Sequence, residues 1–199
     1  MYDMGIVATI IVAIEQMTTA DDMQVINRIR KGDVNAFEVV VENYQTAIGR
    51  FIYRMTGDYH LTQDLTQDAF VRAYKSILKT HSEISLKAWL YRIARNVVFA
   101  HNRRKRLISF VPFSKTGEEA LLDPEDLSQQ GEERLTIQNT LCQVSYDKRV
   151  CMVLHYVEGY KYREISELLG ISEDAVRKRV ARGNVEFRCL YEKEGGGRK

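Results

Sequence analysis

The stretch Tyr162–Arg188 constrains the fold of this chain most, because two helical patterns meet there across a very short turn. Apolar residues recur at helical spacing over Ile165–Leu169, and Gly170 ends that pattern. Ser172 follows as the expected N-cap of a second helix, and the acids after it are favoured by the positive end of the helix dipole. Two helices joined in this way predict a helix-turn-helix.

The second helix of this pair has an apolar side and a basic side. Val176, Val180 and Phe187 repeat at helical intervals, so we expect them to face inward. The opposite side is the one that a DNA major groove would meet. It carries Arg177, Lys178, Ala181 and Arg182. A solvated basic helix on an ordinary hairpin would show the same charges, but the short turn and the cap favour DNA binding.

Every strong periodicity in the chain is helical, and no run alternates at a period of two. This pattern predicts an all-α fold. The expected helices are Asp22–Lys31, Val34–Thr56, Leu61–Lys79, Ser85–Arg106, Glu132–Val144, Tyr146–Val157, Tyr162–Leu169 and Glu173–Glu192.

Charge divides the chain into two basic blocks around an acidic connector. Residues 21–106 carry fifteen Lys and Arg against nine Asp and Glu, whereas residues 107–131 carry one against five. The connector also holds both prolines and loses helical periodicity, so we expect a flexible linker there. Residues 132–194 form the expected second module, and residues 195–199 a disordered tail. This organisation suggests two nucleic-acid-binding modules.

The N-terminal extension and the cysteines bear on location. Gly5–Ile14 is apolar but shorter than the roughly 20 residues that span a bilayer, and no basic leader precedes it. We assign residues 1–20 no function; they are expected to be disordered, to pack as a short helix, or not to be translated. Three cysteines without metal-ligand spacing and without a secretory signal are typical of a reduced cytoplasmic protein with no metal site.

Ser85–Arg106 combines a core stripe with a basic face. The stripe consists of Trp89, Ile93, Val97 and Ala100. The other face carries Arg92, Arg95, Asn96, Phe99, Asn102, Arg103 and Arg106. Cations track phosphates, and an aromatic ring or a guanidinium stacks on an unpaired base, which favours partly single-stranded nucleic acid. A charged solvent face with a basic end that complements the helix dipole explains the pattern equally well.

His60–Lys79 has a broad apolar face and a small polar cluster opposite it. Asp64, Gln67 and Asp68 form this cluster near the expected start of the helix. The helix dipole favours acids there, and a docking face for a protein partner would look the same. The residues alone do not separate these two interpretations.

Three segments together resemble one known family. DLTQDAFVRAYKSI, AWLYRIARN and YREISELLGISEDAVRKRVAR occur in this order, and they are similar to the polymerase-docking helix, the promoter-melting helix and the helix-turn-helix of extracytoplasmic-function (ECF) sigma factors. The resemblance covers nearly everything from Met23 to Tyr191. Three motifs in the right order are much more specific than a single helix-turn-helix.

The resemblance implies a fold, an activity and a set of partners. Residues 21–106 would be the helical bundle called sigma region 2, and residues 132–194 the helix-turn-helix called region 4. The protein would be a non-enzymatic subunit without a cofactor or small-molecule substrate. Its implied partners are the clamp helices of the β′ subunit and the β flap of RNA polymerase core, promoter DNA, and an anti-sigma factor that can hold it at the membrane. The acidic linker would thread the RNA channel.

The resemblance also assigns roles to single residues. Those at polymerase-binding positions are Asp64, Leu65, Gln67, Asp68 and Phe70, of which Phe70 is expected to be core rather than contact. Those at positions for the −10 element and melting are Lys79, Trp89, Arg92, Arg95, Asn96, Phe99, Arg103, Arg104 and Arg106, with the loop Lys79–Ser85 as the pocket for a flipped base. Those at positions for the −35 element are Ser172, Arg177, Lys178, Arg179, Ala181 and Arg182.

The chain departs from the family pattern at three places. Val144-Ser145 stands where Leu-Pro is usual, Asp174-Ala175 where Gly-Thr is usual, and Arg182-Gly183-Asn184 where Arg-Ala-Arg is usual. Asp174 is expected near the groove and Gly183 is expected to weaken the helix. The promoter sequence therefore does not transfer from relatives.

Two other functions account for less of the sequence. A free-standing DNA-binding regulator explains Tyr162–Arg188 but leaves Asp64–Phe70 and Trp89–Asn96 without a role. A nuclease or recombinase would need a carboxylate set, a nucleophile with its base, or a phosphate-binding glycine loop, and the sequence offers none of these patterns.

Overall fold

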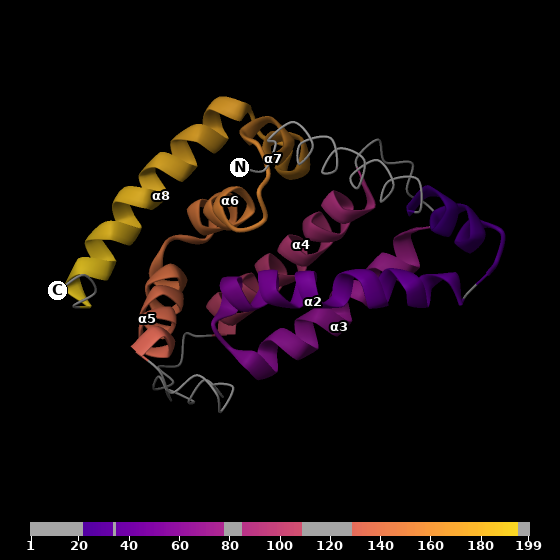
Figure 1. Cartoon of the computed structure of the whole chain (residues 1–199), viewed down its shortest axis with the longest axis horizontal. Helices are drawn as coiled ribbons and strands as arrows, with labels where there is room; N and C mark the ends of the chain where they lie inside the picture. The colour runs from indigo at the N-terminus through magenta and orange to yellow at the C-terminus, as the bar shows by residue number, and fades with distance from the viewer. Residues whose placement is uncertain (1–21, 34, 78–84, 109–128, 195–199) are drawn as a thin grey trace, which may run out of the picture.

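The computed structural model of the 199-residue chain describes residues 22–33, 35–77, 85–108 and 129–194, and every regular element in these ranges is an α-helix (Figure 1). A first helix covers residues 22–30. It is followed by α2 (Ala36–Thr56), α3 (Tyr59–Ile77), α4 (Leu86–Ile108), α5 (Gln129–Gln143), α6 (Tyr146–Tyr156), α7 (Tyr162–Leu169) and α8 (Glu173–Lys193). The predicted all-α fold is confirmed, and each helix end lies within three residues of the prediction.

The linker is shorter than the sequence pattern predicts. Leu107 and Ile108 extend α4, and Gln129–Gly131 begin α5, so both helices reach into the segment 107–131. The predicted boundary followed the loss of amphipathic periodicity, which does not by itself stop a helix. The expected N-terminal extension, the rest of the linker and the C-terminal tail lie outside the described residues. No helix in the described ranges is both long and apolar enough to cross a membrane.

Three helices, α2, α3 and α4, pack against one another as the N-terminal module (Figure 1). The rings of Phe51 and Tyr91 meet edge to face at 5.2 Å between centroids, and both side chains are fully buried. Gly57 ends α2 with a φ of 70°, a left-handed conformation that favours glycine. The helix at 22–30 is tied to α2 because the Tyr44 hydroxyl donates to the Asp22 carboxylate at 2.9 Å.

The C-terminal module consists of α5–α8 and contains the predicted helix-turn-helix. At the start of α7 the Lys161 N–H donates to the Glu164 carboxylate at 2.6 Å. Gly170 ends α7 with a φ of 66°, and the Ser172 hydroxyl accepts from the Ala175 N–H at 3.2 Å. The N-cap predicted at Ser172 is thus confirmed. In Figure 1, α6 lies between α8 and the N-terminal module, and it contacts both α8 and α2.

Gly183 lies where α8 approaches α6 most closely. The helix α8 runs unbroken through Gly183, which is buried. A Cβ atom at this position would overlap Sδ of Met152 and lie 3.3 Å from Cβ of Lys148. The absence of a side chain therefore allows the close packing of α6 and α8, which explains why a residue of low helix propensity stands here.

We expect Gly183→Val to destabilise the chain by about 2 kcal/mol, because overpacking of a close helix contact costs roughly 1–3 kcal/mol. Urea unfolding followed by circular dichroism measures this change. Ala181→Val, at an exposed position of the same helix, is the matched control and should cost less than about 1 kcal/mol. Equal losses in the two variants would show that Gly183 has no special packing role.

Candidate nucleic-acid and partner-binding surfaces

The first half of α8 presents the basic side that the sequence predicts. Val176 and Val180 are buried in the module. The opposite side chains are exposed: Arg177, Lys178, Ala181 and Arg182. Ser172 is also exposed, and its hydroxyl is engaged as the N-cap. Helical periodicity thus places four of the six candidate −35 residues side by side on an accessible surface.

Arg179 does not share this surface. Its side chain is 31% exposed and its guanidinium lies 3.8 Å from the Asp147 carboxylate of α6. The prediction grouped Arg179 with its outward neighbours, but a turn of about 100° per residue carries it round toward α6. In this conformation Arg179 links α8 to α6 through this ion pair and does not face outward.

Acids in the first turn of α8 partly neutralise its basic side. Arg177 pairs with Glu173 at 3.2 Å, and Lys178 pairs with Asp174 at 2.7 Å. The hydrogen bond from Lys178 lowers the pKa of Asp174. Both pairs are exposed and each joins residues four apart, an arrangement of modest strength in water. Asp174 therefore competes with any phosphate for Lys178.

The helix α4 carries the second candidate face. Arg92, Asn96 and Phe99 are exposed along it. The Arg95 guanidinium donates to the Asn96 side-chain oxygen at 3.1 Å, and it lies 6.0 Å from the centre of the Phe99 ring. Cation, amide and aromatic ring are therefore contiguous, as stacking on an unpaired base requires. The same face continues into exposed Arg103 and Arg104.

Of the remaining candidate −10 residues, Trp89 is the one whose side chain the structure describes, and it does not lie on this face. Trp89 is 8% exposed and belongs to the core of the N-terminal module, so here its place is in the apolar stripe and not on the basic face. Its large apolar ring gains more from burial than a smaller side chain would, which explains why it lies in the core. Lys79 and the loop 79–84 lie outside the described residues, and the Arg106 side chain is not described.

The candidate polymerase-binding residues divide between surface and core. Asp64 and Gln67 are exposed, and Asp68 binds Arg72 through two hydrogen bonds of 2.9 Å. Leu65 and Phe70 are 7% and 8% exposed. The expectation that Phe70 is a core residue agrees with this burial.

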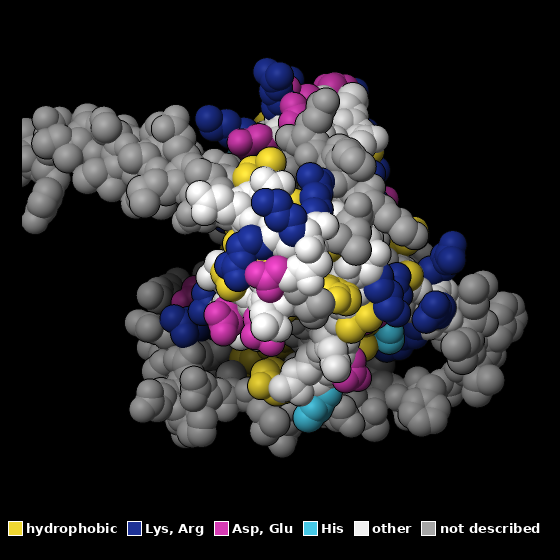
Figure 2. Space-filling model, turned by 90° about the vertical axis from the view of Figure 1, so that its right-hand side faces the viewer, with side chains coloured by type: hydrophobic (Ala, Val, Ile, Leu, Met, Phe, Trp, Pro, Cys, Tyr) yellow, Lys and Arg dark blue, Asp and Glu magenta, His cyan; other side chains and the backbone are white. Residues whose placement is uncertain are grey.

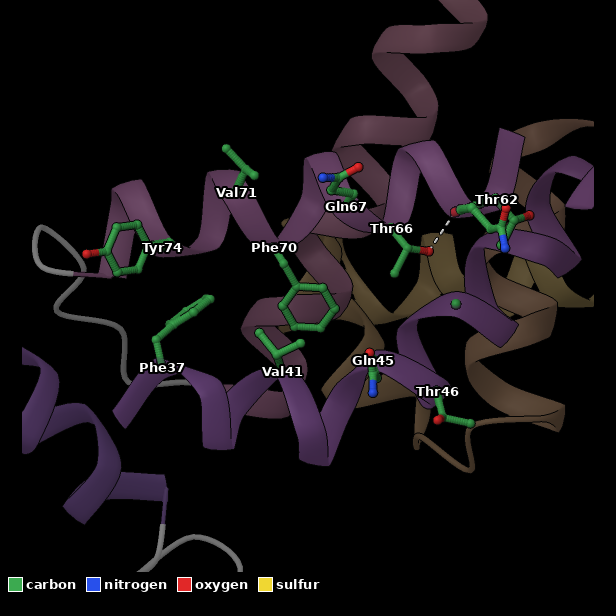
Figure 3. A pocket seen from close by; sticks show the side chains of 12 residues that line it. Phe37, Val41, Gln45, Thr46, Thr62, Thr66, Gln67, Phe70, Val71 and Tyr74 are labelled. Atoms are coloured by element: carbon green, nitrogen blue, oxygen red, sulfur yellow. Dashed lines mark hydrogen bonds between the residues drawn. The ribbon is translucent and has the colours of Figure 1, made fainter. Parts of the chain in front are cut away.

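A groove between α2 and α3 adjoins this cluster, and the sequence did not predict it. The groove has a volume of about 740 Å³. Figure 3 shows Phe70 reaching from α3 toward Val41 of α2, with Gln67 at its edge. At the other end the rings of Phe37 and Tyr74 meet edge to face at 5.2 Å. Val71 and Tyr74 on α3 are apolar but exposed. Apolar residues beyond those needed for the core face of this helix were the sign of the groove that the sequence offered. Apolar grooves between helices are typical docking sites for a partner helix.

A second cavity, of about 1010 Å³, lies between the two modules. Its walls include Phe99 and Arg103 of α4 and Lys178 and Arg182 of α8. Residues predicted to touch two different DNA elements thus line one space. Elsewhere on the surface, acidic side chains stand among the basic ones (Figure 2). Among the described residues no group of His, Cys, Asp and Glu has the arrangement of a metal site.

Each module matches a domain of a known protein family. Sigma-70 region 2 matches residues 40–108, and Sigma-70, region 4 matches residues 134–183. The ECF RNA polymerase sigma factor SigW of Bacillus subtilis is 32% identical over 173 residues, which are 82% of this chain and 92% of the relative. The RNA polymerase sigma-H factor of Pseudomonas aeruginosa is 31% identical over 176 residues, covering 83% and 91%.

Two solved structures share the fold. The structure of CnrH in complex with the cytosolic domain of CnrY has a TM-score of 0.65 at 20% identity, and it covers 87% of this chain and 98% of the solved one. The sigma factor RpoE in complex with the anti-sigma factor NepR from Bartonella quintana has a TM-score of 0.62 at 22% identity, covering 80% and 98%.

Proposed function

The chain belongs to the ECF sigma factors of the sigma-70 family, and we propose that its two modules divide polymerase binding, promoter recognition and strand opening among the surfaces described above. The observation that carries this proposal is the exposed basic side of α8 together with the contiguous Arg95, Asn96 and Phe99 on α4. A free-standing regulator would use the first surface and leave the second, with the polar cluster on α3, without a role.

In this proposal α8 enters the major groove at the −35 element. Arg177, Lys178 and Arg182 supply the positive charge for phosphates and the donors for base edges. Arg side chains recognise guanine through two hydrogen bonds, whereas a contact to phosphate sets position without reading sequence. Ala181 leaves room for the helix to approach the bases.

The helix α4 acts later, at the −10 element. Arg92, Arg103 and Arg104 would follow the backbone of the separated strand, while Asn96 and Phe99 meet an unpaired base. Extruding a base costs a few kcal/mol, and stacking on an aromatic ring returns roughly 1–3 kcal/mol. The chain needs no catalytic group or cofactor for this work, because the polymerase carries the chemistry.

The polymerase core is the proposed protein partner. Asp64, Gln67 and Asp68 would bind the clamp helices of its β′ subunit, with the α2–α3 groove beside them as an apolar support, and the C-terminal module would meet the β flap. An anti-sigma factor is a further proposed partner, because the sigma factor RpoE, which shares this fold, was solved in complex with the anti-sigma factor NepR. We place the protein in the cytoplasm, where polymerase and promoter are found.

The test is run-off transcription with purified core enzyme and genomic fragments. We expect transcripts from a discrete set of promoters only when the chain is added. A chain that binds promoter duplex but never associates with core enzyme would contradict the proposal and support the regulator instead. A pull-down from the native host, scored for core subunits and for a small co-purifying protein, tests the partners.

Asp174→Asn is expected to raise the affinity of the holoenzyme for promoter duplex about three-fold at low salt. The substitution removes a negative charge beside the groove-facing side of α8 and releases Lys178 from its 2.7 Å ion pair. Filter binding across a salt series measures the change, which should shrink as salt rises. Glu167→Gln, which breaks the exposed pair of Glu167 with Arg163 on α7, is the control and should leave affinity unchanged.

A further inference from the structure

The cavity bounded by α4, the start of α6 and α8 carries a high density of positive charge. Its volume of about 1010 Å³ lies at the upper end of the roughly 300–1,000 Å³ that small-ligand pockets span. Seven Lys and Arg residues line it against a single acid, Asp147. Five of the seven come from α4 and α8, the two helices that face each other across it. The size and charge of this basic cavity suit a small anionic ligand.

Three of the cations in the basic cavity are not neutralised by the protein. Three others form ion pairs with carboxylates, and Arg149 donates to main-chain carbonyls. Arg103, Lys105 and Arg182 have no ion pair or hydrogen bond within the part of the chain that the structure describes. Like charges around one space repel each other, so a multivalent anion between them is favoured. A chain of two or three phosphates has the matching charge.

Arg149 adds buried positive charge to the wall of the cavity. Its side chain is 9% exposed, and it donates to the Met55 carbonyl at 2.5 Å and to the Val144 carbonyl at 2.8 Å. Burial lowers the pKa of Arg149, but a guanidinium keeps its proton at neutral pH. In the described ranges it forms no ion pair, so a nearby anion would offset the cost of burying its charge.

An aromatic wall lies beside these cations. The Phe99 ring is exposed, and it lies 5.9 Å from the Tyr146 ring between centroids. The Asn102 amide, one turn further along α4, also lines the cavity. Lys105 follows Phe99 by six residues, or about 9 Å along the helix. A ribose separates the base of a nucleotide from its phosphates, so a ring for stacking and cations one to two turns away suit its two ends.

The N-terminus of α6 borders the same cavity, but an acid already occupies it. The Glu186 carboxylate accepts from the Ser145 N–H at 3.0 Å and pairs with Lys148 at 2.5 Å. A ligand phosphate would be repelled there. The phosphates therefore belong on the three cations without a partner, and not on the start of α6.

The dimensions of the cavity distinguish it from the proposed DNA surfaces. A space of about 1010 Å³ between helices is too small to admit a DNA duplex. Lys105 and Arg149 line it and have no role in the proposed promoter contacts. A single strand passing Phe99 is the remaining alternative, and the first test below includes it.

We propose that the basic cavity is a binding site for a nucleoside di- or triphosphate, with the base against Phe99 and the phosphates on the three cations without a partner. Arginine binds phosphate through paired hydrogen bonds and lysine as a point charge. The bound nucleotide would cover Phe99 and Arg182, which are proposed to contact two promoter elements. It would therefore compete with DNA for the free chain. This competition rests on the proposed function, whereas the binding site does not.

The first test is isothermal titration calorimetry of the full chain at low salt with ATP, GTP, inorganic triphosphate and adenosine. We expect the tighter of the two nucleotides to bind at least about ten-fold more tightly than inorganic triphosphate, because only the nucleotide stacks a base. Adenosine should bind at least about a hundred-fold more weakly than ATP, because it lacks the charged groups. Equal affinities for nucleotides and inorganic triphosphate would overturn the proposal. Tighter binding of a single-stranded trinucleotide would assign the cavity to the DNA strand instead.

The second test locates the two ends of the ligand. Lys105→Glu reverses a charge in the cavity and should weaken nucleotide and inorganic triphosphate alike, by about ten-fold. Phe99→Ala should weaken the nucleotide alone, to the affinity of inorganic triphosphate. Lys75→Glu makes the same charge change at an exposed position of α3 outside the cavity and should leave both affinities within about two-fold. Equal losses in the two Glu variants would place binding elsewhere and overturn the proposal, and thermal melts report whether each variant is folded.

The third test measures competition at constant ionic strength. By mass action, nucleotide at four times its dissociation constant should weaken binding of the free chain to duplex from a promoter recovered by run-off transcription about five-fold. Duplex binding by the Lys105→Glu chain should respond much less at the same nucleotide concentration. An unchanged duplex affinity of the wild-type chain would overturn the competition. Failure of the proposed function would appear instead as absence of transcripts with polymerase core, and it would leave the calorimetric results as they are.

Discussion

Asp64→Ala combined with Asp68→Ala is expected to lower the affinity for polymerase core at least about thirty-fold while leaving the fold intact. Both carboxylates lie on the outside of α3, away from the core residues Leu65 and Phe70. The Asp68 carboxylate pairs with Arg72 across one helical turn at the surface, a pair worth roughly 0.5 kcal/mol or less. Little stability is lost, so a large loss of binding would report the missing contact with the clamp helices.

The loss should be large because these charges sit beside the apolar groove between α2 and α3. We expect the groove to exclude water from these carboxylates on binding, and removing one partner of a buried charge pair costs about 2–5 kcal/mol because the other partner is left unpaired. Binding to core measured by fluorescence anisotropy tests the prediction. Arg163→Ala with Glu167→Ala removes an equivalent exposed pair on α7 and should leave core affinity within two-fold. An unchanged affinity of the Asp64 and Asp68 variant for polymerase core would support the free-standing regulator.

Most of the fold could be predicted because helix signals are local. Periodicity, the N-cap at Ser172 and the break at Gly170 each depend on neighbouring residues, and the structure confirms the end of α7 and the start of α8. The same reasoning placed the exposed cations of α8 correctly, since a buried stripe at Val176 and Val180 fixes which side is outward. Features that depend only on spacing along one helix were therefore predictable.

Contacts between helices distant in sequence could not be predicted. By local propensity Gly183 is a poor helix residue, and only the approach of Met152 explains its presence. Helical spacing alone turns Arg179 away from the outward cations of α8, but its partner on α6, Asp147, could not be predicted from the sequence. The α2–α3 groove and the contact of Tyr146 with Arg95 each join segments that are far apart in the sequence. A single sequence does not indicate which residues of two such helices meet.

Trp89 and Phe99 show why the aromatic residues of α4 needed the structure. The sequence prediction placed both among the residues for the −10 element and melting, and they lie ten residues apart on the same helix. Trp89 is 8% exposed and Phe99 is 45% exposed. Replacing each residue by Ala should therefore change the stability of the N-terminal module by very different amounts. Trp89→Ala should lower the free energy of unfolding by roughly 3–5 kcal/mol, whereas Phe99→Ala should barely change it.

Phe99→Ala is expected to lower the rate or extent of promoter opening by about ten-fold or more, with binding of the holoenzyme to duplex at the −35 element unaffected. The exposed ring beside Arg95 is the proposed stacking surface, and losing it would forfeit roughly 1–3 kcal/mol per base. Permanganate footprinting of unpaired thymines, with holoenzyme reconstituted from the variant, measures opening separately from binding. Phe99→Tyr keeps a flat ring and should restore opening.

The reason to expect unchanged duplex binding is that Phe99 lies on α4, whereas the −35 element is proposed to meet α8. A general folding defect would lower both opening and duplex binding, and an exposed ring without a role would change neither. Loss of opening with unchanged duplex binding would therefore support a role of the exposed Phe99 ring in strand capture.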